Sequence, residues 1–263
     1  MKKTSLIVSI AGVAALMLPF GLLADSHEGA MERGPITDIW YVVPKRGMEA
    51  QFSEAMAAHM AFRAEAGESR DWQAYRVVVG HEINPIRFRA CCFEWADLDA
   101  FQAEDEEKGL GANFNENVDQ YVDHYHHYLE RVDWENSHWP DGETDGPFYG
   151  VTSWTIKQGA GPGSEEARKK LSEVALHQGW AEAGHNWVWL TRIGGKPVIQ
   201  VVTSKANYAD MAPTEPSFFK FVTEQLGADE AAAVFAQFGG GFTSSDYKIW
   251  RYDESLSSPS DDE

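Results

Sequence analysis

The sequence predicts an α+β fold in which the two halves of the chain repeat one β-α-β-β-α-β order of elements. Helix-like and strand-like spacings of apolar residues follow one another in the same order twice. The tetrapeptide AEAG occurs once in each order, at 64–67 and at 181–184. Self-similarity within one chain indicates a duplication, so the two halves are expected to fold alike.

The first half is expected over residues 34–137. Phe52, Met56 and His59 recur at helical spacing, which predicts a helix after the first apolar strand. An Asn-Pro dipeptide marks a turn between the next two β-rich runs. The expected elements are a strand at 39–44, a helix at 48–62, strands at 72–80 and 86–95, a helical stripe at 114–125 and a strand from 128.

The second half is expected over residues 148–254. Ser164 can cap its first helix, because a serine hydroxyl accepts a hydrogen bond from the backbone at a helix start. Residues 138–147 are the expected linker, and residues 255–263 are expected to be a disordered acidic tail. The expected elements are a strand at 151–157, a helix at 165–180, strands at 186–194 and 197–205, helices at 218–226 and 231–238, and a strand at 246–254.

This order of elements is ferredoxin-like, an antiparallel sheet with helices on one face. The strands carry large apolar residues on both sides, as residues 187–190 show, so the other sheet face also needs cover. Two halves in one chain can cover each other, sheet against sheet, and close a barrel-like core. We therefore expect an internal pseudo-dimer, and the sequence leaves open whether such pseudo-dimers pair further.

The chain begins with two lysines and an apolar run that ends near Ala24, as a secretory signal peptide does. We expect cleavage after residues 1–24 and a periplasmic or secreted protein, with an uncleaved N-terminal anchor as the alternative. Residues 1–24 hold two lysines and no acid, so cleavage moves the net charge from −19 to −21. A chain this acidic repels nucleic acid and anionic membrane surfaces, and neither is an expected partner.

The two cysteines, Cys91 and Cys92, are neighbours in an expected strand. Consecutive side chains of a strand point to opposite faces, so a disulfide between them would need a strained turn and is not expected. Aligning the halves places them opposite Val201 and Val202. Both cysteines are therefore expected to be small core side chains.

Two short patterns resemble a known family. The first is VVPKRGMEAQF at 42–52, a strand ending in V-x-P-x-x-G that runs into a helix with an early Phe; the second is W-x-D-x-x-x-F at Trp95, Asp97 and Phe101. With these the chain resembles the dimeric α/β-barrel superfamily, which includes antibiotic-biosynthesis-monooxygenase-like, NIPSNAP-like and haem-degrading proteins. The resemblance implies the barrel fold, and it implies a pocket for a small apolar or aromatic molecule between sheet and helices.

Candidate ligand-binding residues follow from that resemblance and from residue type. His59 lies on the apolar face of its helix, and its nearest counterparts in the second half are Leu176 and Gln178, so packing does not require an imidazole. Aromatic residues in strands belong to the core as a rule, and they can also line an aromatic pocket. The candidates are His59, Trp40, Trp72, Trp95, Trp154, Trp187 and Trp189.

Three of the nine histidines, His124, His126 and His127, lie within four positions. If the preceding helix continues, they lie on its flanks and solvent face; aligned with the second half, His124 and His126 lie at a helix-to-strand junction opposite Ser244 and Asp246. The second half has no histidine there, so the fold does not require them. A divalent metal could bind this corner, and a solvated polar surface is the alternative.

Haem-degrading relatives imply an iron-ligating histidine on the second helix and an asparagine on the first strand. His124 lies near the end of the corresponding helix, but the first strand contains no asparagine. No cofactor is therefore predicted, and haem or a divalent metal at the histidine-rich corner is the alternative.

The sequence favours an exported small-molecule-binding protein, acting as a binder or as a cofactor-independent monooxygenase on an electron-rich substrate. One alternative is a non-enzymatic interaction module with filled pockets, and another is a haem- or metal-binding enzyme.

Overall fold

The computed structural model describes residues 33–140 and 146–259. The expected signal peptide, part of the linker and the last four residues of the tail lie outside the described residues. Within the described ranges, no helix is both long enough and apolar enough to cross a membrane.

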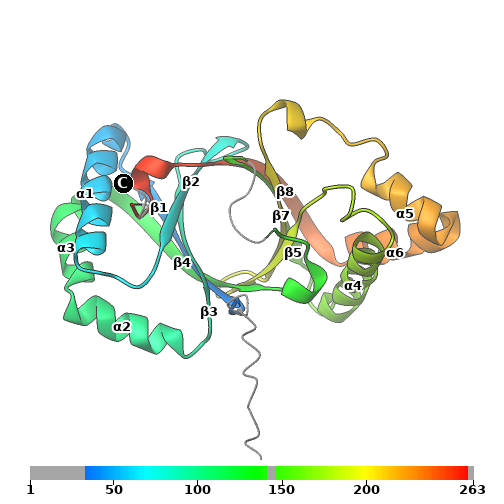
Figure 1. Ribbon diagram of the computed structural model, residues 1–263, viewed down its shortest axis with the longest axis horizontal. Coiled ribbons are helices and arrows are strands. Elements are labelled where there is room, and N and C mark those ends of the chain that lie inside the picture. Colours follow the sequence, from blue (N-terminus) through cyan, green and yellow to red (C-terminus); the bar gives the residue numbers. More distant parts are fainter. Residues whose placement is uncertain (1–32, 141–145, 260–263) are drawn as a thin grey trace, which may run out of the picture. The chain divides into compact units, whose positions relative to one another are not determined.

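Eight strands close into a single antiparallel barrel (Figure 1). The strands are β1 (Ile36–Pro44), β2 (Trp72–Val79), β3 (Ile86–Phe93), β4 (Val122–Val132), β5 (Phe148–Ile156), β6 (Val188–Ile193), β7 (Val198–Lys205) and β8 (Phe242–Tyr252). Their order around the barrel is β1-β3-β2-β8-β5-β7-β6-β4. Each half thus supplies four neighbouring strands, and the pairs β2–β8 and β4–β6 join the halves. The predicted pair of ferredoxin-like halves, closed as an internal barrel, is confirmed.

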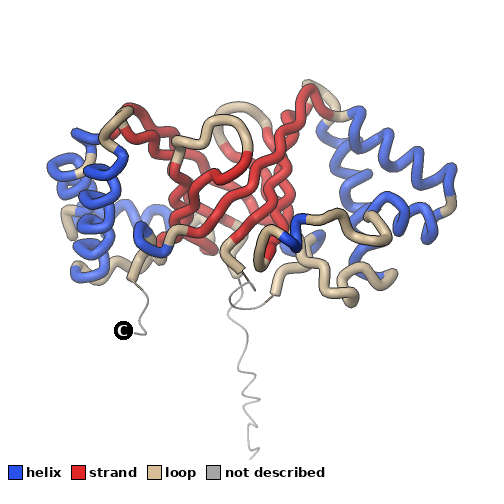
Figure 2. Tube along the Cα trace, turned by 90° about the horizontal axis from the view of Figure 1, so that it is seen from above, coloured by secondary structure: helices blue, strands red, loops and turns tan. Residues whose placement is uncertain are grey.

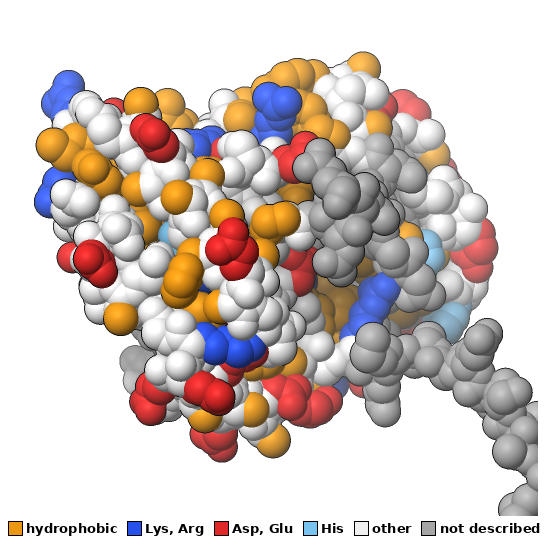
Figure 3. All heavy atoms as spheres, turned by 60° about the vertical axis from the view of Figure 1, so that its left-hand side comes forward, with side chains coloured by type: hydrophobic (Ala, Val, Ile, Leu, Met, Phe, Trp, Pro, Cys, Tyr) orange, Lys and Arg blue, Asp and Glu red, His pale blue; other side chains and the backbone are white. Residues whose placement is uncertain are grey.

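The helices lie outside the barrel, in one group for each half (Figures 1 and 2). The first group is α1 (Glu49–Glu65), α2 (Asp97–Glu107) and α3 (Leu110–Asn117), and the second is α4 (Gly161–His177), α5 (Phe218–Leu226) and α6 (Ala228–Gly240). The face shown in Figure 3 is that of the first group, where acidic side chains are spread among hydrophobic ones.

Packing between helices and sheet follows the predicted helical stripe. Phe52, Met56, His59 and Met60 are the buried residues of α1. Phe52 is fully buried against the sheet, together with Ile86 and Phe88 of β3. Leu171 and Val222 lie in the corresponding apolar layer of the second half. Both helix–sheet layers are therefore apolar cores filled by side chains.

The two AEAG tetrapeptides do not occupy equivalent positions in the two halves. β5 begins 112 positions after β1, and α4 begins 112 positions after α1. The first AEAG (64–67) spans the end of α1, whereas the second (181–184) lies in a longer turn after α4. Because that turn inserts extra residues, the expected counterparts Leu176 and Gln178 were wrong, and His59 corresponds to Leu171.

The segments that follow β4 and β8 are exchanged between the halves. The short 3₁₀ turn η2 (Trp134–Asn136) packs on α4 and β6, and η4 (Glu254–Leu256) packs on α1 and β2. In each case a serine hydroxyl accepts a backbone N–H of the other half, Ser137 from Trp189 at 2.9 Å and Ser257 from Ala74 at 2.9 Å. The segment after the last strand of each half therefore hydrogen-bonds to the other half.

The tail prediction was wrong for residues 255–259. Leu256 is only 1% exposed, and Ser258 accepts the backbone N–H of Trp72 at 2.9 Å. A prediction of disorder from composition averages over the segment. It therefore misses the effect of a single apolar side chain, whose burial holds the neighbouring residues in place.

The cysteine prediction was also wrong. Cys91 and Cys92 form a disulfide within β3, and the pairing of β1 with β3 shifts register at this point, between Ile36 and Thr37. The irregular pairing breaks the regular alternation of side chains on which the prediction rested. The register of the repeat places the two cysteines opposite Thr203 and Ser204, not opposite Val201 and Val202.

Candidate functional site

A cavity of about 700 Å³ opens at one end of the barrel. It lies where β1, β2, β5 and β6 end, and side chains from six of the eight strands and from the β2–β3 loop surround it. Alternate residues of each strand face inward, so the cavity wall contains every second residue. This cavity lies between the two half-sheets, whereas the pocket was expected between sheet and helices.

The histidine-rich segment forms one wall of this cavity. β4 begins at Val122, so the strand starts earlier than expected and the predicted helical stripe does not reach Tyr125. His124 and His126 face inward and line the cavity, with their ring centroids 5.4 Å apart. His127 faces outward, where it stacks on Trp40 at 4.2 Å.

The three histidines therefore do not converge on one point, as a shared metal site would need. The outward ring of His127 also contacts the Asp38 carboxylate at 2.7 Å. In residues 33–140 and 146–259, no three His, Cys, Asp or Glu side chains are grouped so that they could hold a metal ion. The strand alternation explains the separation, since an even and an odd position cannot share a face.

The opposite wall comes from β8, the counterpart of β4 in the repeat. Asp246 and Lys248 line the cavity, and they occupy the positions of His126 and Tyr128 in the first half. The Lys248 ammonium lies 3.8 Å from Asp246 and 3.9 Å from Glu82. The two walls thus have equivalent strands, but one presents histidine side chains and the other presents an aspartate and a lysine.

Glu82 lies at the rim, in the β2–β3 hairpin. Its φ angle of 55° is in the left-handed region, which a glutamate rarely adopts. Backbone conformations of this kind cost about 1–3 kcal/mol and concentrate at functional sites. The unusual backbone conformation of Glu82 therefore lies at the same end of the barrel as the cavity.

The inner part of the cavity is aromatic and cationic. The Arg192 guanidinium lies over the Tyr128 ring, 4.4 Å from its centroid, and its Nε atom is buried without a hydrogen-bond partner. Tyr41 and Trp250 also line the cavity. Gln200 donates a hydrogen bond to the Ser153 hydroxyl at 2.8 Å. This surface can contact an aromatic body and can still donate hydrogen bonds.

A buried ion pair lies close to this surface. Arg87 donates to the Glu130 carboxylate at 2.5 Å, and Glu130 is fully buried. Burial acts to lower the pKa of Arg87, but the negative charge of Glu130 beside it opposes this effect, and that pKa is raised. Burial raises the pKa of Tyr41, and it raises the pKa of Tyr75 to about 12. The guanidinium therefore stays charged while both phenols stay neutral.

The residues expected to bind a ligand lie elsewhere, outside the cavity wall. Trp40 and Trp72 belong to the apolar layer of the first half, and Trp154, Trp187 and Trp189 belong to that of the second. Trp154 and Trp189 are brought together, with ring centroids 5.9 Å apart. Trp95 is 52% exposed. The structure thus distributes these tryptophans over two separate layers and the surface.

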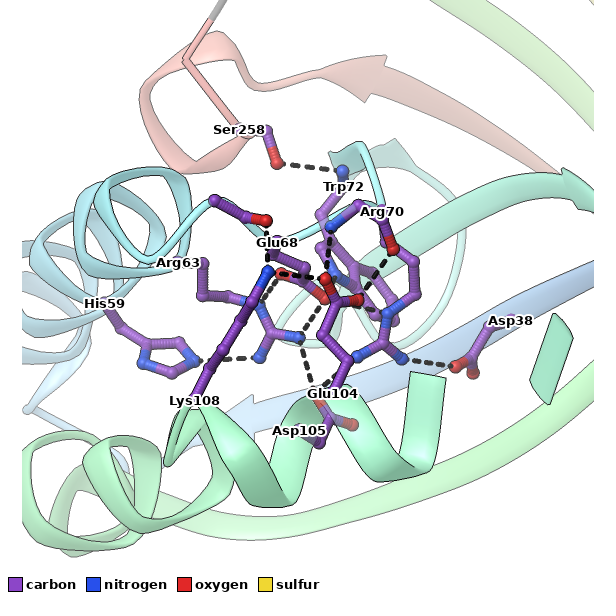
Figure 4. A network of polar contacts seen from close by, with 12 residues as sticks. Asp38, His59, Arg63, Glu68, Arg70, Trp72, Glu104, Asp105, Lys108 and Ser258 are labelled. Atoms are coloured by element: carbon purple, nitrogen blue, oxygen red, sulfur yellow. Dashed lines mark hydrogen bonds and ion pairs between the residues drawn. The ribbon is translucent and has the colours of Figure 1, made fainter. Parts of the chain in front are cut away.

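His59, on the buried side of α1, belongs to a polar network that joins α1 to α2 (Figure 4). Its Nδ1 lies 2.8 Å from Asn113 Oδ1, and Arg63 donates to its Nε2 at 3.2 Å. Arg63 in turn pairs with the buried Glu68. Because both ring nitrogens are engaged and the layer around them is filled, His59 does not fit a haem-iron ligand.

The burial of His59 should make the stability of the protein depend on pH. Burial lowers its pKa, so the unfolded chain binds a proton more readily than the native protein does. Stability should be complete above the unfolded value of about 6.5 and should fall as the pH drops below it. His59→Gln keeps one donor and one acceptor, and it should flatten the loss of stability measured by urea unfolding between pH 7.5 and 5.5. The exposed His81 provides the control, since His81→Gln should keep the wild-type slope; an unchanged slope in His59→Gln would contradict this assignment.

Sequence reasoning missed the inner cavity residues, chiefly Tyr41, Tyr128, Arg192 and Gln200. Their signal is the alternation of the strands: Tyr41 lies one position from Trp40, and Tyr128 lies one position from His127. Choosing between the two faces needs the knowledge of which face meets the helices.

The chain thus has the fold of a dimeric α/β barrel, with both barrel halves in one polypeptide. Solved structures share this fold. A protein provisionally named a monooxygenase, from Fusobacterium nucleatum, has a TM-score of 0.52 and 12% identity, and the match covers 84% of this chain and 94% of that one. An anthrone oxidase-like protein has a TM-score of 0.50 and 12% identity, covering 87% and 95%.

A mutant chlorite dismutase from Candidatus Nitrospira defluvii also has a TM-score of 0.50, at 9% identity, covering 84% of this chain and 94% of that one. At such identities the likeness concerns the fold. No protein-family model and no curated protein sequence matches the chain.

Proposed function

We propose that this chain is an exported protein that binds a small aromatic molecule in the barrel cavity. The carrying observation is a cavity of about 700 Å³ lined by aromatic, histidine and arginine side chains from both halves. Binding sites for small molecules have volumes of this order and combine apolar walls with a few polar groups. Export is supported by the lysines and the apolar run within residues 1–24.

The reaction that suits this cavity is a cofactor-independent oxygenation. An aromatic ketone with a CH₂ group that is conjugated to the carbonyl through an aromatic ring can give up a proton and become an electron-rich, enolate-like anion. His126 lines the cavity wall, and we assign it the role of accepting that proton, since histidine is the side chain that most often acts as a general base. Arg192 is placed to stabilise the resulting anion. One atom of dioxygen then becomes the oxygen of a new carbonyl at the former CH₂, and the other atom leaves as water, with all four electrons supplied by the substrate.

Anthrone is a suitable test substrate, because it carries such a CH₂ group and because one structural neighbour is named anthrone oxidase-like. The purified chain should accelerate conversion of anthrone and dioxygen to anthraquinone and water above the uncatalysed rate. Oxygen uptake and anthraquinone absorbance should agree at one to one. His126→Gln should reduce the rate about 10²-fold or more, the usual contribution of a general base.

The neighbouring histidine provides a matched control. His127→Gln makes the same change one position away on the outer face of β4, and it should keep most of the activity. Equal losses in the two variants would argue against His126 as the base. A rate no higher than the background would remove the oxygenase proposal and leave binding to be tested by itself.

A further inference from the structure

We infer that the ligand of the barrel cavity is an aromatic acid, whose anionic group is bound by Arg192. The inference rests on the proposed binding function and specifies the class of molecule. It starts from a contrast in charge: the whole chain carries −19, whereas the inward-facing surface of the barrel near Arg192 is cationic.

The cationic groups are three arginines on inward-facing strand positions. Arg87 and Arg89 belong to β3, and Arg192 belongs to β6. The carboxylate close to them, Glu130, is already engaged by Arg87 at 2.5 Å. One carboxylate cannot neutralise three guanidinium groups, so this part of the barrel has a surplus of positive charge.

Unused hydrogen-bonding capacity accompanies this charge. The Nε atoms of Arg87 and Arg192 are buried and have no hydrogen-bond partner, and Arg87 as a whole is only 8% exposed. A buried donor without a partner is costly, so native proteins as a rule supply a partner from the chain, from water or from a ligand. Arg192 lines the cavity, so a ligand that enters can supply the missing acceptor.

The carboxylates of the site do not prevent an anion from binding there. Glu82 and Asp246 line the cavity at the rim, where the Lys248 ammonium lies within 4 Å of both. Glu130 keeps one carboxylate oxygen, Oε1, without a partner, but its charge is balanced by Arg87. The charge at the Arg192 end is therefore positive after these pairs are counted.

The surrounding rings determine the rest of the ligand. Arg192 stacks on Tyr128, and Tyr41 and Trp250 line the same cavity. Aromatic side chains bind aromatic rings through offset or edge-to-face contacts. Guanidinium groups bind carboxylates through charge-assisted hydrogen bonds, which are stronger than neutral ones. A flat ring with one carboxylate or phenolate matches both features.

Two nearly isosteric probes separate charge from shape. Isothermal titration of the full mature chain at pH 7 with 2-naphthoate and with the neutral 2-naphthamide should give at least tenfold tighter binding of the naphthoate. Arg192→Gln should weaken naphthoate binding at least tenfold and leave naphthamide binding within about twofold. Arg131→Gln is the matched control, because Arg131 lies on the neighbouring strand β4 and is exposed.

The outcomes separate this inference from the proposed function. If naphthamide binds as tightly as naphthoate, or if Arg192→Gln leaves naphthoate binding unchanged, the anionic class is wrong while the cavity remains a binding site. If neither probe binds, both the binding function and this inference fail for aromatic molecules of this size.

Discussion

Arg87→Met should destabilise the protein by about 3–5 kcal/mol, because the change leaves the Glu130 carboxylate buried without its cation. Glu130 is fully buried, so water cannot solvate the charge in the native state. In the unfolded chain the same carboxylate is hydrated, and the free energy of unfolding therefore decreases. Urea unfolding at pH 7, followed by tryptophan fluorescence, measures the loss.

The partner substitution makes this prediction specific to the ion pair. Replacing both residues, as Arg87→Met with Glu130→Leu, should recover most of the lost stability, since a buried pair is often replaced by apolar side chains at little cost. The matched control is Arg76, which pairs with Asp253 between the halves and whose side chain is 38% exposed. Arg76→Met should cost about 1 kcal/mol or less, as partly exposed ion pairs do. Equal losses for Arg76→Met and Arg87→Met would show that the buried pair has no special role.

The order of elements was predictable because each half has to bury one face of its sheet and one stripe of its helix. The stripe Phe52, Met56 and His59 carries that information locally, and the structure buries all three. Closure of the two half-sheets was predictable for a related reason, since the strands are apolar on both sides. These are properties of single elements and need no knowledge of distant contacts.

The cavity could not be predicted in the same way. Tyr41, Arg192 and Trp250 are separated by more than fifty residues along the chain and meet only because the barrel closes. The tryptophans were predicted to line a pocket because they are aromatic, but large rings also fill the core between helices and sheet. All three histidines lie within β4, which begins at Val122, whereas the apolar spacing before them suggested a continuing helix. A shift of one residue decides which histidines face the cavity.

Filling the cavity should abolish ligand binding more completely than any change of charge. Ser153 lies in the middle of β5 and lines the cavity, where its hydroxyl accepts a hydrogen bond from Gln200 at 2.8 Å. In Ser153→Trp an indole takes the space that a naphthyl ring would occupy. Binding of 2-naphthoate should weaken more than 100-fold, which corresponds to about 2.8 kcal/mol.

The control is the same substitution on the outside of the barrel. Ser245 lies on β8, next to β5, and is exposed on the face opposite to that of the cavity-lining Ser244. Ser245→Trp should bind 2-naphthoate like the wild type, and thermal unfolding should show that both variants are folded. If Ser153→Trp instead keeps wild-type affinity for a probe that the wild type binds, the ligand lies outside the barrel. A site between helices and sheet would require the packed side chains of that layer to move apart, whereas the barrel cavity is already open. The barrel interior is therefore the expected site.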